Sequence, residues 1–422
     1  MERGCLSWCG SGPNVAVRGL ASGARVLHRV DTFPKIVECF SLLCSPPDSR
    51  LTAVCEHMYS ARTSAEHGDY ESGLLAWQAA QAMLTEDDRA PLRAACALGA
   101  GLTQLALHDA TAAVRCADEA IGLLCSHAQE ASVPLDAWLL RAEALESASE
   151  VESAANAWDE VLARARALRE SGASRKIRLP AQKERIARRR AEHLRSLVAS
   201  VKQQTDNSNA AVTLSLTPTP EQDAVFAAWY DFTHPHGTFP ICLRPGGVMY
   251  APGFLESGSR WYVASPDGTS IALTWGKYGD FQLNVTNAAE RVLSGSALNM
   301  PEEWRRMKAT RPLSPAEAKL LGAGGAGSRW TFEWSGGSFP VEFRGDVFNH
   351  FVCSSYPTQS HWTLGGANGD ELSIDWAQYG KYEIRVDGAA GTGEGSVAGK
   401  PEDWRRMTYV ADLAELRTSR AN

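Results

Sequence analysis

Two nearly identical heptapeptides lie 100 residues apart in this chain, PEEWRRM at 301–307 and PEDWRRM at 401–407. The match continues upstream at separations of 100 or 101 residues, which indicates a tandem duplication with few insertions. The chain must therefore fold two similar modules. The paired positions are Trp229 with Trp330, Phe239-Pro240 with Phe339-Pro340, Trp261 with Trp362, Trp275 with Trp376, Tyr278-Gly279 with Tyr379-Gly380, and Gly295 with Gly395.

The duplicated segments have the pattern of short β-strands. In the second copy SFPVEFR, HFVCSSY, HWTLGG, ELSIDW and YEIRVD are rich in aromatic and β-branched residues and are separated by glycine, asparagine or proline. Leu372, Ile374 and Trp376 alternate with polar residues, so they share one face of a strand. The sequence predicts two small antiparallel β barrels or rolls, at 221–310 and 327–412, joined by a linker at 311–326 and followed by a tail at 413–422.

The WRRM motif is interpreted as a closure signature of each module. A closed meander must seal its ends, which a tryptophan ring can do by inserting while a neighbouring guanidinium stacks on an aromatic ring. In outline this resembles the calycin superfamily, whose barrels are closed by an N-terminal tryptophan under a late arginine, although each module is short for that superfamily. The resemblance implies that Trp229 pairs with Arg305 or Arg306, and Trp330 with Arg405 or Arg406. The closure residues are Trp304, Arg305, Arg306, Trp404, Arg405 and Arg406.

The region before the duplication is rich in alanine and leucine, which predicts packed helices over 52–164. One spacing of small and aromatic residues occurs three times, at Tyr70, Gly73, Trp77 and Ala80, at Ala110, Ala113, Ala117 and Ala120, and at Val151, Ala154, Trp158 and Val161, with Ala61, Gly101 and Ala142 upstream. This pattern resembles tetratricopeptide repeats, with a period of 40 to 41 residues instead of 34. An unrelated alanine-rich helical bundle is the alternative.

The resemblance implies a concave groove lined by the first helix of each repeat. Its clamp positions, which in some family members grip a C-terminal carboxylate, would be Met58, Arg62, Gly99, Asp136 and Leu140, and this set cannot hold a carboxylate. The groove would present Arg62, Glu66, Leu98, Leu102, Leu105, Glu143 and Glu146. We expect an apolar groove with acidic ends, which suits a helix or an extended peptide that carries basic residues.

A helix beginning near Pro180 is expected to cap the array, so that the helical domain spans 51–203. Its cluster of arginines could bind RNA, an acidic partner or an anionic membrane surface, and the alternative is that it is the solvated face of the helix. The polar, proline-marked segment 204–220 is expected to be a linker. The candidate basic patch consists of Arg185, Arg188, Arg189, Arg190 and Arg195.

Net charge, the length of apolar runs, cysteine spacing and the N-terminal segment limit the class of protein and its location. The net charge of −7 over 422 residues argues against nonspecific nucleic-acid binding, and no apolar run is long enough to span a bilayer, so we expect a soluble protein. The 10 cysteines show no CxxC pair, which favours a reducing, cytoplasmic compartment. Segment 1–50 is arginine-rich and acid-poor. It is read as a disordered extension or as an organellar transit peptide, which would place the protein in a mitochondrion or plastid.

No catalytic motif, cofactor-binding loop or metal-ligand spacing is found. His350, His361, Asp375 and Cys353 of the second copy have no matching chemical groups in the first, and the pair in His234-Pro235-His236 is expected to be solvent-exposed. The favoured function is a non-enzymatic adaptor that binds protein partners through the groove and the β modules. The alternatives are a small-molecule carrier or enzyme with its ligand in the barrels, and a co-chaperone without the carboxylate clamp.

Overall fold

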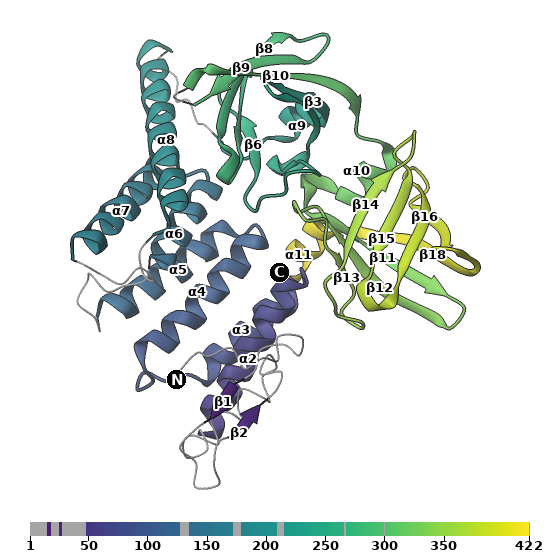
Figure 1. Cartoon of the computed structure of the whole chain (residues 1–422), viewed down its shortest axis with the longest axis horizontal. Helices are drawn as coiled ribbons and strands as arrows, with labels where there is room; N and C mark the ends of the chain where they lie inside the picture. The colour runs from purple at the N-terminus through teal and green to yellow at the C-terminus, as the bar shows by residue number, and fades with distance from the viewer. Residues whose placement is uncertain are drawn as a thin grey trace.

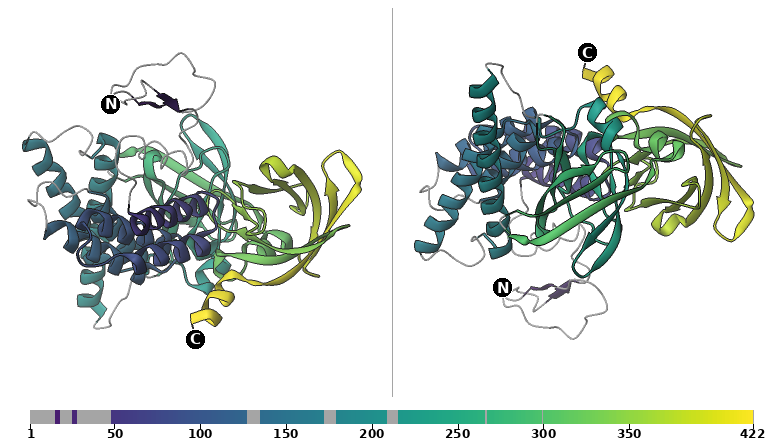
Figure 2. Two further views of the ribbon diagram at one scale, coloured as in Figure 1. Left: turned by 90° about the horizontal axis from the view of Figure 1, so that it is seen from below. Right: turned by 90° about the horizontal axis from the view of Figure 1, so that it is seen from above.

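The chain folds into an array of helices followed by two nearly closed, eight-stranded antiparallel β modules, as Figure 1 shows. This confirms the predicted multidomain α + β architecture. The computed structural model describes residues 15–17, 25–27, 48–126, 135–171, 179–208, 215–265, 267–298 and 300–421. Figure 2 shows the second β module at one end of the long axis of the molecule and helices α7 and α8 at the other.

The array consists of helical hairpins in which small residues let paired helices approach closely. Ala61 and Ala142 are fully buried, and a Cβ atom on Gly101 would collide with Leu140 and Cys116. The second helices of the first two hairpins begin at aspartate caps, because Asp69 and Asp109 accept hydrogen bonds from backbone N–H groups in the first turn. The helices are α2 Ser49–Glu66, α3 Tyr70–Met83, α4 Ala90–Ala106, α5 Ala110–Cys125, α6 Asp136–Ser147 and α7 Val151–Glu170.

Helix α8, Ala181–Ser208, has the expected apolar stripe but lies between two domains. Leu194 and Leu197 belong to a buried cluster that contains Trp158 of α7 and also Tyr262 of the first β module. One face of α8 therefore closes the array while a neighbouring face supports the barrel beside it (Figure 1). The helix continues five residues past the expected boundary at 203, into the segment interpreted as linker.

Each β module is an antiparallel meander in which the first strand along the chain pairs with the last. These pairs are β3 with β10 and β11 with β18. The strand orders are β5-β4-β3-β10-β9-β8-β7-β6 and β13-β12-β11-β18-β17-β16-β15-β14. Met249 N–H donates to Ser259 O, and Phe351 N–H donates to Ser360 O, so that backbone bonds close each ring. The strands of the first module are β3 Ala228–His234, β4 Gly237–Leu243, β5 Met249–Tyr250, β6 Arg260–Val263, β7 Ser270–Thr274, β8 Asp280–Asn287, β9 Val292–Ala297 and β10 Met300–Pro312.

The second module repeats this arrangement, and its interior is likewise filled by side chains. Trp261 in the first module and Trp330 in the second are fully buried, each in an aromatic and aliphatic core. The predicted alternation is confirmed, because Leu372 and Ile374 point into the core and the polar residues that alternate with them along β15 are exposed. Its strands are β11 Gly327–Trp334, β12 Gly337–Arg344, β13 Phe351–Val352, β14 His361–Gly365, β15 Glu371–Asp375, β16 Lys381–Asp387, β17 Thr392–Val397 and β18 Lys400–Asp412.

A short helix precedes each module, so the segment expected to be a linker at 311–326 is structured. Helices α9, Pro220–Phe226, and α10, Pro315–Leu321, both begin with a capping box and a proline in the first turn. The capping residue is Thr219 in the first copy and Ser314 in the second, so the duplication includes this element. The expected tail at 413–422 also differs, since α11 spans Leu413–Ala421.

The two β modules meet at a glycine-rich contact between the 3₁₀ turns η2, Pro245–Gly247, and η4, Ala323–Gly325. A Cβ atom on Gly246 would overlap the carbonyl oxygen of Gly324, and one on Gly325 would overlap the carbonyl oxygen of Pro245. Gly246 also adopts φ +72°, a conformation that disfavours other residues. Backbone therefore packs directly on backbone where the modules join.

Most of segment 1–50 lies outside the described residues. Its described parts are the antiparallel pair β1 Val15–Val17 and β2 Arg25–Leu27, and the start of α2. The readings of this segment as a disordered extension or a transit peptide stay predictions. Among the described helices, none combines the length and the apolar composition that crossing a membrane requires.

We predict that Gly246→Ala destabilises the chain more than Gly258→Ala does. Both glycines have a φ near +72°, but a Cβ atom on Gly258 meets open space. In the control Gly258→Ala, the free energy of unfolding should fall only by the cost of placing alanine at positive φ, about 1–2 kcal/mol. Gly246→Ala should lose more, because its Cβ atom must also displace the opposing module. Urea unfolding of both variants measures the difference. Equal losses would show that the two turns do not pack tightly.

Candidate functional site

The predicted groove residues lie on the first helices of the hairpins, which are neighbours in space because α4 packs against both α2 and α6. On this face Arg62, Glu66 and Glu143 are exposed. Leu102, in the C-terminal half of α4, has 50% of its surface exposed, and Leu98 and Leu105 are half-buried beside it. Six of the seven predicted groove residues thus reach the surface of the array.

The seventh, Glu146, was predicted wrongly as a groove residue, because its side chain is buried. Its Oε1 accepts a hydrogen bond from Arg190 Nη1 at 2.7 Å, and its Oε2 accepts one from Trp158 Nε1 at 3.1 Å. Glu146 follows Glu143 by three residues, and this rotation about α6 turns it toward α7 and α8. Glu146 of α6 therefore forms an internal ion pair with Arg190 of α8 and a hydrogen bond with Trp158 of α7.

Glu143 lies one helical turn before Glu146 on α6 and is exposed. Reduced hydration, and then the charge of Glu146, raise the pKa of Glu143, while Arg190 and Arg260 act in the opposite direction. Arg260 is the first residue of β6, so this end of the predicted groove faces the first β module. Of the two glutamates predicted at this end of the groove, only Glu143 is exposed.

The candidate basic patch divides into two sets with different roles. Arg185, Arg188 and Arg195 are exposed, and Arg188 and Arg195 lie 3.5 Å and 3.7 Å from Glu184 and Asp159. Arg189 and Arg190 point inward, which contradicts their assignment to a surface patch. The helical period of α8 turns them toward the first module and α6, respectively.

The inward face of α8 fastens the first β module to the array. Arg189 Nη2 donates to the backbone oxygen of Gly276 at 2.8 Å, and its Nε lies 3.6 Å from Asp280 Oδ2. His193 Nε2 hydrogen-bonds the Tyr262 hydroxyl. Burial lowers the pKa of His193 to about 4, so the imidazole is neutral at neutral pH. This docking surface combines one charged contact with one neutral contact.

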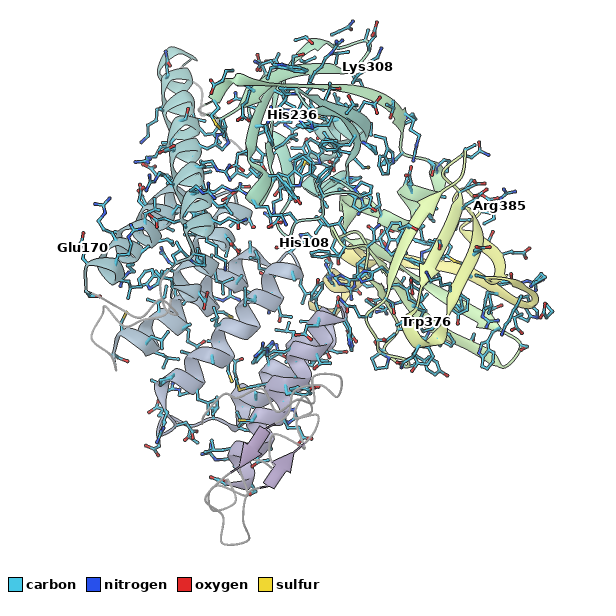
Figure 3. All side chains as sticks on the ribbon, viewed as in Figure 1. His108, Glu170, His236, Lys308, Trp376 and Arg385 are labelled. Carbon is cyan, nitrogen blue, oxygen red and sulfur yellow. The ribbon has the colours of Figure 1, made fainter. Side chains whose placement is uncertain are left out.

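A different charged cluster fastens the second β module to the array. Arg344 at the end of β12 binds both carboxylate oxygens of Glu71 in the first turn of α3, and Arg417 Nε of α11 donates to the same carboxylate at 3.1 Å. Although burial acts to raise it, the pKa of Glu71 is lowered to about 2 by the two guanidinium groups. Figure 3 shows His108, in the turn after α4, near the centre of the molecule where these elements converge.

The WRRM motif does not place its tryptophans inside the barrels. Trp304 and Trp404 are 47% and 40% exposed. Strand alternation explains this exposure. Met307 and Met407 are buried, so Arg305 and Arg405, two positions earlier, point to the same inner face, and the tryptophans, three positions earlier, point to the outer face. The arginine after each tryptophan lies over the aromatic core, with Arg305 Cζ 5.0 Å from the Phe281 ring centroid and Arg405 Cζ 5.2 Å from that of Tyr382.

The calycin-like pairing also differs from the expectation. Trp229 is opposite Arg311 in the β3–β10 ladder, and the Arg311 guanidinium lies 5.2 Å from its ring centroid. Glu317 accepts from both Trp229 Nε1 and Arg311, so the partner of the tryptophan comes from the end of β10. In the second copy Trp330 packs on Tyr409 instead of an arginine.

The histidines do not belong to a group of three or more potential metal ligands within the described residues. His234 and His236 lie at the β3–β4 turn with ring centroids 5.7 Å apart. His350 Nδ1 is 2.7 Å from Asp346 Oδ2, and His361 Nδ1 is 2.9 Å from the backbone oxygen of Phe348. Both second-module histidines therefore have structural partners.

Glu71, Arg344 and Arg417 join the array to the second module, but they were not among the functional residues predicted from the sequence. Arg344 does have a counterpart 100 residues earlier, Arg244, so the duplication offered one signal. Glu71 and Arg417 are 346 residues apart along the chain, and no local pattern relates them. Only the folded chain brings these charges together.

No family model matches the chain, and comparisons with curated proteins and with solved structures also give no match. The chemistry and exposure of the residues themselves are therefore the basis for inferring the function of the protein.

We predict opposite effects for two neighbouring glutamates of α6. Glu146→Gln leaves the buried Arg190 without its counter-charge and should lower the free energy of unfolding by about 3–5 kcal/mol. Glu143→Gln removes a charge that its surroundings disfavour and should leave stability unchanged or slightly raised. Chemical denaturation of both variants at pH 7 tests this, and comparable losses would contradict the assignment of Glu146 as the internal partner.

We also predict that Glu71 contributes stability that disappears in acid. Its folded pKa of about 2 lies below its ordinary value of 4.5, so the contribution is complete above pH 4.5 and is lost as pH falls toward 2. The difference in unfolding free energy between native protein and Glu71→Gln, up to about 3 kcal/mol at neutral pH, should shrink across that window. Exposed Glu170→Gln is the control. A pH-independent difference for Glu71→Gln would refute the prediction.

Proposed function

We propose that this protein is a non-enzymatic interaction adaptor that binds a peptide segment of a partner protein on α4 and the first helices beside it. The observation that carries the proposal is the exposure of Leu102. Leu102 lies four residues before the C-terminal end of the 17-residue helix α4, and half of its surface is uncovered although helices pack on both sides of α4. Neighbouring apolar side chains that form one surface stripe, here Leu102 with half-buried Leu98 and Leu105, are a feature of protein-binding sites.

The apolar stripe of Leu98, Leu102 and Leu105 has the spacing of one helix face. The β modules and α11 contact the array at the turn after α2, at α8 and at the backbone of Leu107 after α4, and half of the Leu102 surface stays uncovered. Ser354 donates to Asp69 in that turn, and a Cβ atom on Gly68 beside it would collide with His350. The tetratricopeptide-like reading, which we keep as part of this proposal, assigns this stripe to the concave surface of the array.

The charges beside the stripe favour a particular partner. Glu66 at the end of α2 and Glu143 of α6 are exposed, with Arg62 as the opposing charge on α2. A partner segment with apolar side chains flanked by lysine or arginine would match this distribution. We therefore propose that the occupant is a helical or extended segment of this composition.

The alternative of a small-molecule carrier has less support. Fully buried side chains such as Tyr230, Trp261, Phe332 and Trp330 occupy the barrel interiors, which leaves little room for a ligand there. The co-chaperone alternative is also disfavoured, because Leu140, at one of the clamp positions, is buried against the array and has no donor group.

We further propose a cytoplasmic location for the adaptor. None of the cysteines within the described residues forms a disulfide, which suits a reducing compartment. An organelle is the alternative if the arginine-rich N-terminus acts as a transit peptide. Fluorescence microscopy of the full chain and of a chain lacking residues 1–47 would distinguish these locations.

We predict that Leu102→Asp weakens partner binding at least about tenfold, because it places a charge at the centre of an apolar contact. Leu75→Asp is the matched control, since Leu75 is 66% exposed on α3, outside the stripe. Full-length native protein and both variants would be used to capture partners from a native extract.

A synthetic peptide from each retained protein, chosen for apolar residues flanked by basic ones, would then be titrated against the three chains. The proposal requires a peptide that binds native protein and Leu75→Asp but not Leu102→Asp, with circular dichroism showing that both variants are folded. Retention that is identical for all three chains, or a peptide that does not distinguish them, would refute the α4 site.

A further inference from the structure

The duplication places equivalent buried arginines in the two β modules. Arg244 follows β4, and Arg344 ends β12 at the matching position. Their side chains are almost entirely buried, with residue exposures of 3% and 2%. The backbone oxygen of Arg244 accepts from Trp261 Nε1 at 2.8 Å, and that of Arg344 accepts from Trp362 Nε1 at 3.0 Å. The two sites thus share one backbone geometry.

The two arginines differ in how their charge is compensated. Arg344 forms ion pairs with Glu342 on its own strand and with Glu71 of α3. In the first module Cys242 occupies the position of Glu342. Within the described residues Arg244 has no carboxylate at ion-pair distance. A buried cation without a counter-charge is unfavourable, so its retention calls for an anion from elsewhere.

The remaining contacts of Arg244 do not satisfy its guanidinium. Nη1 donates to the backbone oxygens of Gly345 and Asp346, at 3.3 Å and 2.9 Å, while buried Nε has no partner, as is also true of Arg344 Nε; the difference between the two arginines is therefore the missing carboxylate. The Asp346 carboxylate, whose charge acts on Arg244 from a distance, is already bound by the backbone N–H of Phe348 and by His350 Nδ1. Burial accordingly lowers the pKa of Arg244.

Arg244 lines a cavity of about 170 Å³ between the two modules, next to α10. Its guanidinium carbon lies 4.0 Å from the ring centroid of Tyr250. Asn349 lines the same cavity, is 3% exposed, and has a buried Oδ1 with no partner. Arg244 and Asn349 thus both line the cavity, and each has a buried side-chain atom without a hydrogen-bond partner.

The other acidic group on the cavity wall does not compensate Arg244. Glu317 accepts hydrogen bonds from Trp229 Nε1, from both terminal nitrogens of Arg311, and from the backbone N–H of Ser314. Its charge is neutralised by Arg311 within this network. Arg244 is thus the cation on the wall that is left for a ligand.

We propose that the cavity between the two β modules binds a small oxyanion, a carboxylate or phosphate, on Arg244, and that a hydroxyl or amine of the same molecule donates to Asn349 Oδ1. Guanidinium groups recognise both anions through directed N–H donors. The cavity is smaller than the usual range for drug-sized ligands, about 300–1,000 Å³, which selects a compact molecule such as a hydroxy acid. The aromatic walls of Trp229 and Trp362 would cover its apolar part.

The test is the thermal unfolding of the full chain in increasing concentrations of sodium lactate, sodium propionate and sodium phosphate, with sodium chloride at matched ionic strength as reference. Lactate carries both a carboxylate and a hydroxyl, and propionate lacks the hydroxyl. We expect lactate to raise the midpoint above the chloride reference in a saturable way, and propionate to bind more weakly. A shift with phosphate alone would assign the site to phosphate groups. If all three anions match chloride, the proposal is wrong.

Two variants locate the effect. Arg244→Gln should weaken the binding at least about tenfold, and Cys242→Glu should abolish it by supplying the internal carboxylate that the second module has. Because Arg244→Gln also removes bonds to Gly345 and Asp346, Cys242→Glu keeps the test decisive if the first variant is unstable. Arg306→Gln, an exposed arginine of the same module, is the control. An unchanged anion response in a folded Arg244→Gln or Cys242→Glu chain would overturn the proposal.

Discussion

The buried guanidinium of Arg344 is the constraint on which the arrangement of this protein depends. A charge so far from water must be matched, and the structure matches it with Glu342 from the same strand and Glu71 from the helical array. The second match is possible only when the α2–α3 turn is held against the second β module. The ion pair between Arg344 and Glu71 therefore fixes the position of the array relative to the second module. Arg417 of α11 also forms an ion pair with Glu71.

The first module is joined to the array by different means, and the contrast shows how duplicated units diverge. Its contacts with α8 are the backbone bond of Arg189, an ion pair with Asp280 and the hydrogen bond of neutral His193 to Tyr262. Arg244, the counterpart of Arg344, is left facing the cavity between the modules. The two equivalent arginines therefore have different roles. Arg344 joins the second module to the array through Glu71, whereas Arg244 has no carboxylate partner within the described residues.

The parts of the fold that local periodicity controls could be predicted. Alternation over Leu372 and Ile374 predicted a strand with one buried face, and the spacing of Ala61, Gly101 and Ala142 predicted close helix pairs. Positions that depend on which face a neighbour covers could not be predicted. Arg190 looks like a member of a surface arginine cluster in the sequence, but the ion pair with Glu146 forms only because α6 and α8 are adjacent.

The sequence by itself determined the modular plan, because repeats, strand alternation and helical spacing are encoded in neighbouring residues. It also determined that two modules would share one backbone plan, down to the capping boxes of Thr219 and Ser314. Only the tertiary structure decided which charges are compensated and which face of α4 is uncovered. Hydration and electrostatic pairing depend on distances between residues far apart in the chain, such as Glu71 and Arg417, and these distances exist only after folding.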